Sequence, residues 1–225
     1  MRWQSHSLES SASIIPVPPC YYIAGVLPEN GVVVDCGTGP DADLSQAIMR
    51  SFGCRCHGVE PTRKHHAALD QVVAASGRRF TYVGRALAAD ARCVRFHESK
   101  TNVSGSILAD HVNVRGDEMI TYEVETVTID ELFELLGVAK IDLLKLDIEG
   151  AEYEVLAAVT TAALSRIDQL IVEFHDHCVP RYSTSDTRRL IRKLRAAGFY
   201  VHSRDGINCL FFRPRPAFVE PTVQR

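Results

Sequence analysis

The sequence predicts an α/β protein built on one doubly wound, mostly parallel β-sheet. Apolar segments typical of strands alternate with amphipathic helical patterns from residue 31 onward. Residues 141–146 (IDLLKL) are apolar almost without alternation, as in a strand that helices cover on both faces. With 225 residues, of which 46% are hydrophobic and 24% charged, the chain has room for one domain with a substantial core. We therefore expect a single domain over residues 20–213.

The first half of the chain predicts the opening strand and helix units. Residues 1–19 end in a proline-rich stretch and predict an arm before the domain, while residues 20–27 predict a short helix. The β-branched run at 31–36 (GVVVDC) predicts the first core strand. The elements that follow are predicted as a helix at 43–52, a strand at 54–60, a helix at 62–76 and a strand at 80–86.

The pattern loosens in the middle of the chain before the core strands resume. Alternating residues predict strands at 93–97 and 121–129. Thr128 and Glu131 have the spacing of a capping box, which predicts the start of a helix there. The later elements are predicted as a strand at 141–146, a helix at 149–159, a strand at 168–174, a helix at 185–197, an antiparallel hairpin of 199–203 and 207–213, and a tail at 214–225.

Charge and composition exclude several classes of partner. A net charge of -3 and a pI near 6.3 provide no basic field over the chain, so we expect no nucleic-acid partner. No stretch approaches the roughly 18 to 20 apolar residues of a membrane span, and residues 1–19 lack the pattern of a signal peptide. Seven scattered cysteines without metal-ligand spacing are typical of reduced thiols. These features predict a soluble, cytoplasmic protein, and none of them predicts an oligomeric state.

A glycine turn follows the first core strand, in the segment VVVDCGTG of residues 32–39. Gly37 and Gly39 stand where a nucleotide-like ligand can approach bare backbone at the start of a helix. Glu60 ends the next strand, 25 residues after Asp35, and is placed to accept hydrogen bonds from a ribose diol. In the structural alternative, Asp35 only ties down the turn and Glu60 only caps the helix that follows.

A group of acids follows the buried strand at 141–146. Ligands of open α/β sheets bind beyond the carboxyl ends of the strands, and Asp147, Glu149 and Glu152 fall there. Acids in the first turn of a helix also gain from the helix dipole, which accounts for Glu149 and Glu152 without any function. Asp147 ends the strand itself, where an unpaired carboxylate is costly to hold, and it is the stronger candidate.

Five segments in order resemble the FkbM family of S-adenosylmethionine-dependent methyltransferases: VVVDCGTG, GVEP, ETVTIDEL, IDLLKLDIEGAEYEVL and LIVEFH. The phrase LKLDIEGAE discriminates best. The resemblance implies the Rossmann-like class I methyltransferase fold, with a seven-stranded sheet in the order 3-2-1-4-5-7-6 whose strand 7 is antiparallel. It also implies S-adenosylmethionine as cofactor and methyl transfer, usually to a hydroxyl oxygen of a sugar, glycan, polyketide or similar small acceptor.

Roles at the cofactor follow from the resemblance, position by position. It implies that Asp35, Gly37 and Gly39 hold the methionine end, that Glu60 binds the ribose, and that Arg85 and Ala86 lie beside the adenine.

Catalytic roles fall on the acid cluster and on the end of the next core strand. Asp147 is the first candidate for a base or an anchor of the acceptor hydroxyl. A carboxylate at Glu149 would raise the proton affinity of the pair, and Lys145 would oppose this if it points the same way. His175 has an ordinary pKa suited to a base near neutral pH, although a histidine hydrogen-bonded at a strand end accounts for it equally.

Two questions stay open at this stage. Asp147, Glu149, His175 and His177 together offer an oxygen-and-imidazole site for Mg²⁺ or Mn²⁺, but two histidines near acids fit several structural interpretations, and our prediction contains no metal. The polar segment 100–117, which includes His111, either shapes the acceptor pocket or is an ordinary surface loop.

Two other functions compete with O-methyl transfer. A glycine turn followed by an acidic strand end also describes the dinucleotide site of a nicotinamide-dependent oxidoreductase, although the third glycine of that motif is missing. A relative that binds the cofactor without turnover is the second alternative. Our prediction is an S-adenosylmethionine-dependent O-methyltransferase acting on a small-molecule or glycan hydroxyl.

Overall fold

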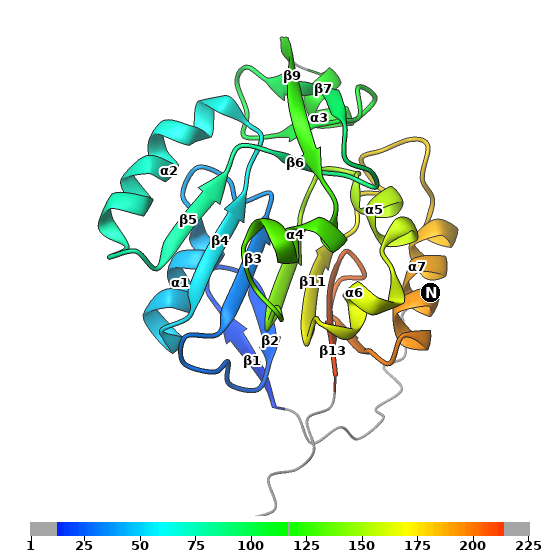
Figure 1. Cartoon of the computed structure of the whole chain (residues 1–225). Helices are drawn as coiled ribbons and strands as arrows, with labels where there is room; N and C mark the ends of the chain where they lie inside the picture. The colour runs from blue at the N-terminus through cyan, green and yellow to red at the C-terminus, as the bar shows by residue number, and fades with distance from the viewer. Residues whose placement is uncertain (1–12, 117, 214–225) are drawn as a thin grey trace, which may run out of the picture.

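A seven-stranded central sheet dominates the computed structural model, which describes residues 13–116 and 118–213 (Figure 1). Its strand order is β12-β13-β11-β10-β3-β4-β5, and β13 runs antiparallel to both of its neighbours. This is the order that the family resemblance implies, and the predicted C-terminal hairpin is its edge. The strands are β3 (Val32–Cys36), β4 (Arg55–Val59), β5 (Phe80–Val83), β10 (Leu143–Leu146), β11 (Gln169–Glu173), β12 (Tyr200–Ser203) and β13 (Asn208–Phe212).

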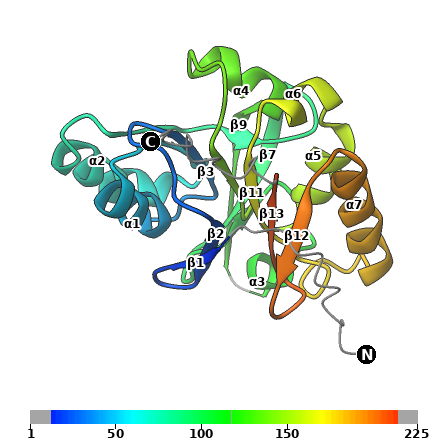
Figure 2. The same ribbon diagram turned by 90° about the horizontal axis from the view of Figure 1, so that it is seen from below.

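Both faces of the sheet are covered, which explains the nearly continuous apolar runs of its central strands. Alternate side chains of one strand enter different cores: Leu144 and Leu146 pack on one face and Leu143 on the other. One face packs against α4, α5, α6 and α7, and the other against α1, α2 and an N-terminal hairpin (Figure 2). The helices are α1 (Asp43–Phe52), α2 (Arg63–Ala75), α4 (Ile129–Leu135), α5 (Glu152–Ala158), α6 (Thr161–Ser165) and α7 (Thr184–Ala196).

The N-terminal hairpin corrects one prediction. The short helix predicted at 20–27 is wrong, because Tyr21–Ala24 forms strand β2, antiparallel to β1 (Ile14–Val17). The side chain of Gln169 fixes this strand against the sheet, donating to the carbonyl of Ala24 at 3.0 Å and accepting from its N–H at 2.7 Å. Of the predicted arm, residues 1–12 lie outside the described residues, as does the predicted tail at 214–225.

A second sheet lies beyond the carboxyl ends of the central strands, at the top of Figure 1. Its order is β6-β9-β7-β8, formed by β6 (Ala86–Leu87), β7 (Cys93–Ser99), β8 (Gly105–Ser106) and β9 (Met119–Val127). The strand predicted at 80–86 therefore ends at Val83, and Ala86 pairs with Thr126 of β9. The predicted irregular segment 100–117 contains β8 and the short helix α3 (Val112–Arg115).

Local signals explain where two of the helices begin. The capping box before α4 is confirmed: Thr128 Oγ1 accepts from the N–H of Glu131 at 3.1 Å, and Glu131 Oε2 accepts from the N–H of Thr128 at 2.9 Å. Helix α5 begins at Glu152, later than predicted, because Glu149 and Gly150 have φ angles of 52° and 100°. Within the described part of the chain, none of these helices is both long and apolar enough to cross a membrane.

Candidate functional site

The glycine turn after β3 uses its two glycines for different reasons. Gly37 has a φ of 73°, and a Cβ there would lie 1.7 Å from the carbonyl oxygen of Asp147, so the turns after β3 and β10 touch through bare backbone. Gly39 has a φ of 69°, and a Cβ there would have no neighbour within 4 Å. Gly39 therefore presents backbone to open space, as a ligand that approaches a helix start requires.

Asp35 lies beneath this turn and not in the open cavity. The residue is 1% exposed, and Ser45 Oγ donates to its Oδ2 at 2.8 Å. Burial raises the pKa of Asp35, and the nearby charge of Lys145 opposes that shift. Asp35 therefore ties the turn to Ser45 of α1 and to the buried side chain of Lys145, as the structural alternative expects.

Lys145 links the turn after β3 to the turn after β10. Its Nζ donates to the carbonyl of Gly37 at 2.7 Å and lies 3.4 Å from Asp35 Oδ1 and 3.2 Å from Asp147 Oδ2. Burial alone would lower the pKa of Lys145, but the two carboxylates outweigh it and hold the pKa well above its ordinary value. Lys145 therefore stays charged and does point toward Asp147.

Glu60 lines a cavity beside the glycine turn. Its Oε2 accepts from the N–H of Gly39 at 2.8 Å and its Oε1 from the N–H of Thr62 at 2.9 Å. Burial would raise the pKa of Glu60, but contacts with His65 and Thr62 outweigh it and lower the pKa. The carboxylate is thus ionised and faces the cavity, as a ribose-binding group must be.

The cavity has a volume of about 130 Å³ and extends from the glycine turn and Glu60 to Asp147 and Glu149. This is below the roughly 300 Å³ of common ligand pockets, so a nucleoside-sized ligand would extend beyond it. Bare backbone, an ionised acid and apolar walls nevertheless match the chemistry of a nucleoside with a charged tail. The predicted residues that line it are Gly37, Gly39, Glu60, Ala86, Asp147 and Glu149, together with apolar residues such as Leu87 and Ile148.

Arg85, like Asp35, is a predicted cofactor residue that does not line this cavity. Its guanidinium lies 2.8 Å from Glu125 Oε2 and lines a neighbouring cavity of about 370 Å³. Arg85 and Ala86 point to different sides because successive residues of an extended chain alternate. Ala86 and Glu60 therefore line the same cavity, whereas Arg85 lines the neighbouring one.

The turn after β10 presents Asp147 and Glu149 to the same cavity. Glu149 has a φ of 52°, in the left-handed region that costs a residue with a side chain about 1 to 2 kcal/mol. Ser106 Oγ holds this conformation by donating to the carbonyl of Glu149 at 2.7 Å. A non-glycine residue kept in such a conformation is typical of functional sites.

His175 lies behind these acids and is oriented by Glu152, which sequence reasoning treated as a helix-start residue. Glu152 is fully buried, and its Oε1 accepts from the backbone N–H of His175 at 2.9 Å and lies 3.1 Å from Nδ1. The other nitrogen, Nε2, lies 3.6 to 3.9 Å from carboxylate oxygens of Asp147, Glu149 and Glu173.

These carboxylates change the proton affinity of His175. Burial alone would lower its pKa, but the bond to Glu152 and the charges of Glu152 and Glu149 raise the pKa to about 9. His175 is therefore protonated at neutral pH in this state, unlike a histidine with the ordinary pKa on which the prediction of a base relied. The pKa of Glu173 is also raised, by burial and by Asp147.

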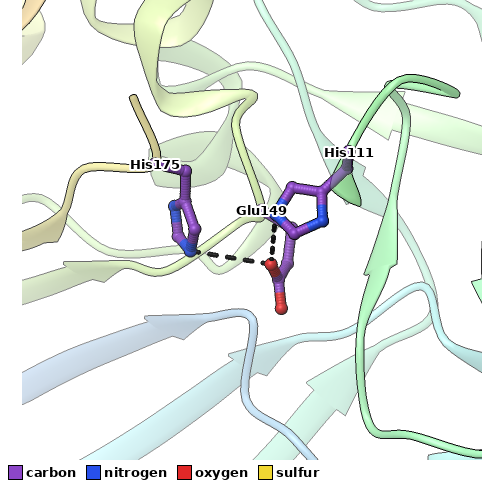
Figure 3. A group of neighbouring side chains, drawn as sticks. All are labelled: His111, Glu149 and His175. Atoms are coloured by element: carbon purple, nitrogen blue, oxygen red, sulfur yellow. Dashed lines mark ion pairs between the residues drawn. The ribbon is translucent and has the colours of Figure 1, made fainter. Parts of the chain in front are cut away.

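His111 is a site residue whose position the sequence did not reveal. It is fully buried, and its Nε2 lies 2.8 Å from Glu149 Oε2, across from His175 (Figure 3). His177, the second histidine of the predicted metal set, is instead exposed and stacks on His175 with ring centroids 5.9 Å apart. No spacing rule connects position 111 with 149 or 175, because the contact depends on how the second sheet sits over the first.

Comparisons with known proteins place this geometry in a family. The family model described as the methyltransferase FkbM domain matches residues 35–201, well over half of the chain. Among curated proteins, the AMB antimetabolite synthetase AmbE of Pseudomonas aeruginosa is 30% identical over 133 residues, which are 53% of this chain. The chain spans only 6% of that synthetase's length.

Solved structures resemble the chain more distantly. A fibrillarin pre-rRNA processing protein of Methanococcus jannaschii is 9% identical, with 90% of this chain and 83% of that chain covered and a TM-score of 0.48. TrmK of M. capricolum, solved with S-adenosyl-homocysteine, is 10% identical, with 84% and 64% covered and a TM-score of 0.43. Similarities this weak carry no argument about function, which rests on the family match and the site. The match over residues 35–201, together with the observed sheet order, shows that this chain belongs to the FkbM family of methyltransferases.

Proposed function

We propose that this chain transfers the methyl group of S-adenosylmethionine to a hydroxyl oxygen of a sugar, glycan, polyketide or similar small acceptor. One observation carries the proposal: the glycine turn, Glu60 and the acids Asp147 and Glu149 line a single cavity. The first two are suited to a nucleoside cofactor, and the acids are suited to an acceptor hydroxyl. Family membership supplies the reaction class, and the acids favour oxygen as the acceptor atom.

The residues at the cofactor end bind and orient. Glu60 accepts hydrogen bonds from the ribose hydroxyls, Gly39 leaves room for the methionine end, and Ala86 with Leu87 forms an apolar wall for the adenine. When bound, the cofactor supplies a methyl group activated by a positively charged sulfur. Well-oriented intramolecular reactions gain about 7 to 11 kcal/mol from positioning, so alignment of the two reactants is the main contribution of this site.

The residues at the acceptor end hold the hydroxyl and take its proton. Transfer forms one oxygen–carbon bond and breaks one carbon–sulfur bond, and the acceptor's proton passes to Asp147. Lys145 Nζ lies 3.2 Å from Asp147 Oδ2 and holds that carboxylate in place. Asp147 therefore acts first as the anchor of the hydroxyl and second as its base.

A small acceptor is favoured over a nucleic acid by charge. The chain has a net charge of -3, and carboxylates of Asp147, Glu149 and Glu173 gather at the acceptor side of the site. A phosphate backbone would be repelled there. The match to a synthetase named for an antimetabolite is in keeping with a small-molecule acceptor.

Replacing Glu60 with alanine is expected to weaken binding of S-adenosylhomocysteine at least tenfold, because hydrogen bonds to a charged group contribute about 1.5 to 3 kcal/mol. Isothermal titration calorimetry measures the effect. The matched control is Glu123→Ala, which removes an exposed acid outside the cofactor cavity and should leave the dissociation constant unchanged. Saturable binding of NADH by the wild-type protein, without binding of S-adenosylhomocysteine, would instead favour the oxidoreductase.

Replacing Asp147 with asparagine is expected to reduce methyl transfer about 10² to 10⁴-fold, the usual contribution of a general base. The assay follows labelled methyl transfer to a panel of sugar, glycan and polyketide hydroxyls, and the affinity for S-adenosylhomocysteine should change little. An undiminished rate in this variant would remove Asp147 from the mechanism. Cofactor binding by the wild-type protein without transfer to any acceptor would identify the relative without turnover.

A further inference from the structure

The acids beside the cavity belong to a cluster that reaches beyond the methyl-transfer residues. His111 from the loop before α3, Glu149 from the turn after β10 and His175 after β11 each direct one ligand atom inward (Figure 3). These three atoms lie within 4.8 Å of one another. Three distant segments of chain thus bring two imidazoles and a carboxylate to one point.

His111 is the member whose presence the protein alone does not explain. Its side chain is fully buried, yet neither ring nitrogen has a hydrogen bond of good geometry to any described residue. A buried polar group left unsatisfied costs about 1 to 3 kcal/mol. Its Nε2 lies 2.8 Å from Glu149 Oε2, so the ring is aimed into the cluster.

His175 has the orientation of a metal-binding histidine. Its Nδ1 is engaged by Glu152 at 3.1 Å, which leaves Nε2 directed at the cluster, 3.6 Å from Glu149 Oε2. Histidines that bind metals commonly use their second nitrogen in this way, with a carboxylate behind the ring. Neighbouring ligands of an ion at about 2.1 Å lie about 3.0 to 3.4 Å apart. The two observed separations, 2.8 and 3.6 Å, lie on either side of that interval.

The charge around the cluster also calls for a cation. His175 Nε2 faces carboxylates of Asp147, Glu149 and Glu173, and the buried Glu152 lies behind the ring. Among the described residues, Lys145 contacts this group through Asp147 and also pairs with Asp35, and protonated His175 supplies a second positive charge, so the carboxylates still outnumber the cations. Partly buried carboxylates that outnumber the nearby cations repel one another, so a bound dication would stabilise the arrangement.

We propose that His111, Glu149 and His175 bind a divalent first-row transition-metal ion such as Zn²⁺ or Mn²⁺, with Asp147 and Glu173 close enough to complete its coordination. Two imidazoles and a carboxylate suit such ions better than Mg²⁺, which prefers oxygen alone. Because Glu149 and Asp147 also line the cavity, an ion bound here would lie beside the acceptor. The ion orients the acceptor oxygen and lowers the pKa of its hydroxyl. This role rests on the proposed function, whereas metal binding itself does not.

Metal binding is tested on tag-free full-length protein freed of metal with a chelator. Titration calorimetry with ZnCl₂ and with MnCl₂, and elemental analysis after desalting, should give one ion per chain with a dissociation constant below about 10 µM. The Co²⁺-loaded protein should show the visible absorption of a site with nitrogen and oxygen ligands. Glu149→Gln and His111→Gln should each weaken binding at least tenfold, as expected when a ligand is lost.

Two histidine variants distinguish this site from nonspecific uptake. His177→Ala removes the exposed ring next to His175, and His97→Ala removes a histidine outside the ligand set whose ring contacts Thr121; both should bind metal like the wild-type protein. Glu149→Gln changes a partly exposed side chain, so it decides the question even if His111→Gln does not fold. Wild-type protein that takes up no ion, or Glu149→Gln that binds equally well, would overturn the proposal.

The same samples separate this proposal from the proposed function. S-Adenosylhomocysteine is titrated into the metal-free protein, and its binding tests the cofactor site alone. Loss of metal binding with cofactor binding retained would therefore be read as failure of the metal site only. Metal binding without cofactor binding would contradict the proposed function and leave the metal site in place.

Discussion

Replacing Gly37 with alanine is expected to lower the free energy of unfolding by about 3 kcal/mol or more. The left-handed conformation alone costs a residue with a side chain about 1 to 2 kcal/mol. The new Cβ would also stand 1.7 Å from the carbonyl oxygen of Asp147, a backbone atom that moves only with the whole turn after β10. Overpacking of this kind adds about 1 to 3 kcal/mol. Urea unfolding, followed by circular dichroism, measures the change.

Two further glycine variants separate strain from overlap. Gly39→Ala shares the left-handed conformation but meets no atom within 4 Å, so it should cost about 1 to 2 kcal/mol while placing a methyl group in the cavity beside Glu60. Gly77→Ala, at a surface turn with a φ of 60° and no neighbour, should cost the same and leave cofactor binding intact. Equal stability of all three variants would show that the two turns do not constrain one another.

Replacing Lys145 with methionine is expected to lower the free energy of unfolding by about 3 to 5 kcal/mol. Removal of one partner from a buried ion pair leaves the other charge uncompensated, and Asp35 is 1% exposed. The variant also removes the hydrogen bond to the carbonyl of Gly37 and releases Asp147. We therefore expect weaker cofactor binding as well, measured by titration calorimetry beside the unfolding curve.

The double variant Lys145→Met with Asp35→Asn tests the cause. If an uncompensated charge at Asp35 dominates, the double variant should be more stable than Lys145→Met alone by at least about 1 kcal/mol. Lys140→Met is the matched control, because Lys140 forms its ion pairs at the surface and should change stability by less than about 1 kcal/mol. A loss at Lys145 no larger than at Lys140 would contradict the assignment.

Much of the central sheet was predictable because its strands obey simple rules. The run at 141–146 has apolar residues for both faces, and the capping box at Thr128 marks a helix by a local hydrogen-bond pattern. The hairpin of β1 and β2 was missed because its stability comes from distant contacts, above all with Gln169. Two strands of the second sheet were predicted, at 93–97 and 121–129, but their assembly with β6 was not, since Ala86 pairs with a residue forty positions later.

The candidate site was likewise predictable where it depends on local sequence and not where it depends on distant contacts. Asp147, Glu149 and Glu60 follow core strands, so the rule that ligands bind at the carboxyl edge of a parallel sheet was enough to single them out. The side chain of Glu152 points into the protein because Glu149 and Gly150, just before it, have positive φ angles. The sequence around Glu152 does not predict those angles. His111 depends on the docking of a segment that has no regular pattern, so only the three-dimensional structure could place it.

The contact between Gly37 and the carbonyl of Asp147, reinforced by Lys145, has a consequence for engineering and for evolution. The segment that we propose to bind the cofactor and the segment that we propose to receive the acceptor are parts of one interlocked unit, although they are more than a hundred residues apart in the chain. A chimaera that borrows residues 141–152 from a relative with another substrate must therefore borrow residues 35–39 as well. Changes in acceptor preference are easier to make at Ser106 of the second sheet and in the loop of His111, because these contact Glu149 rather than Gly37 or Lys145.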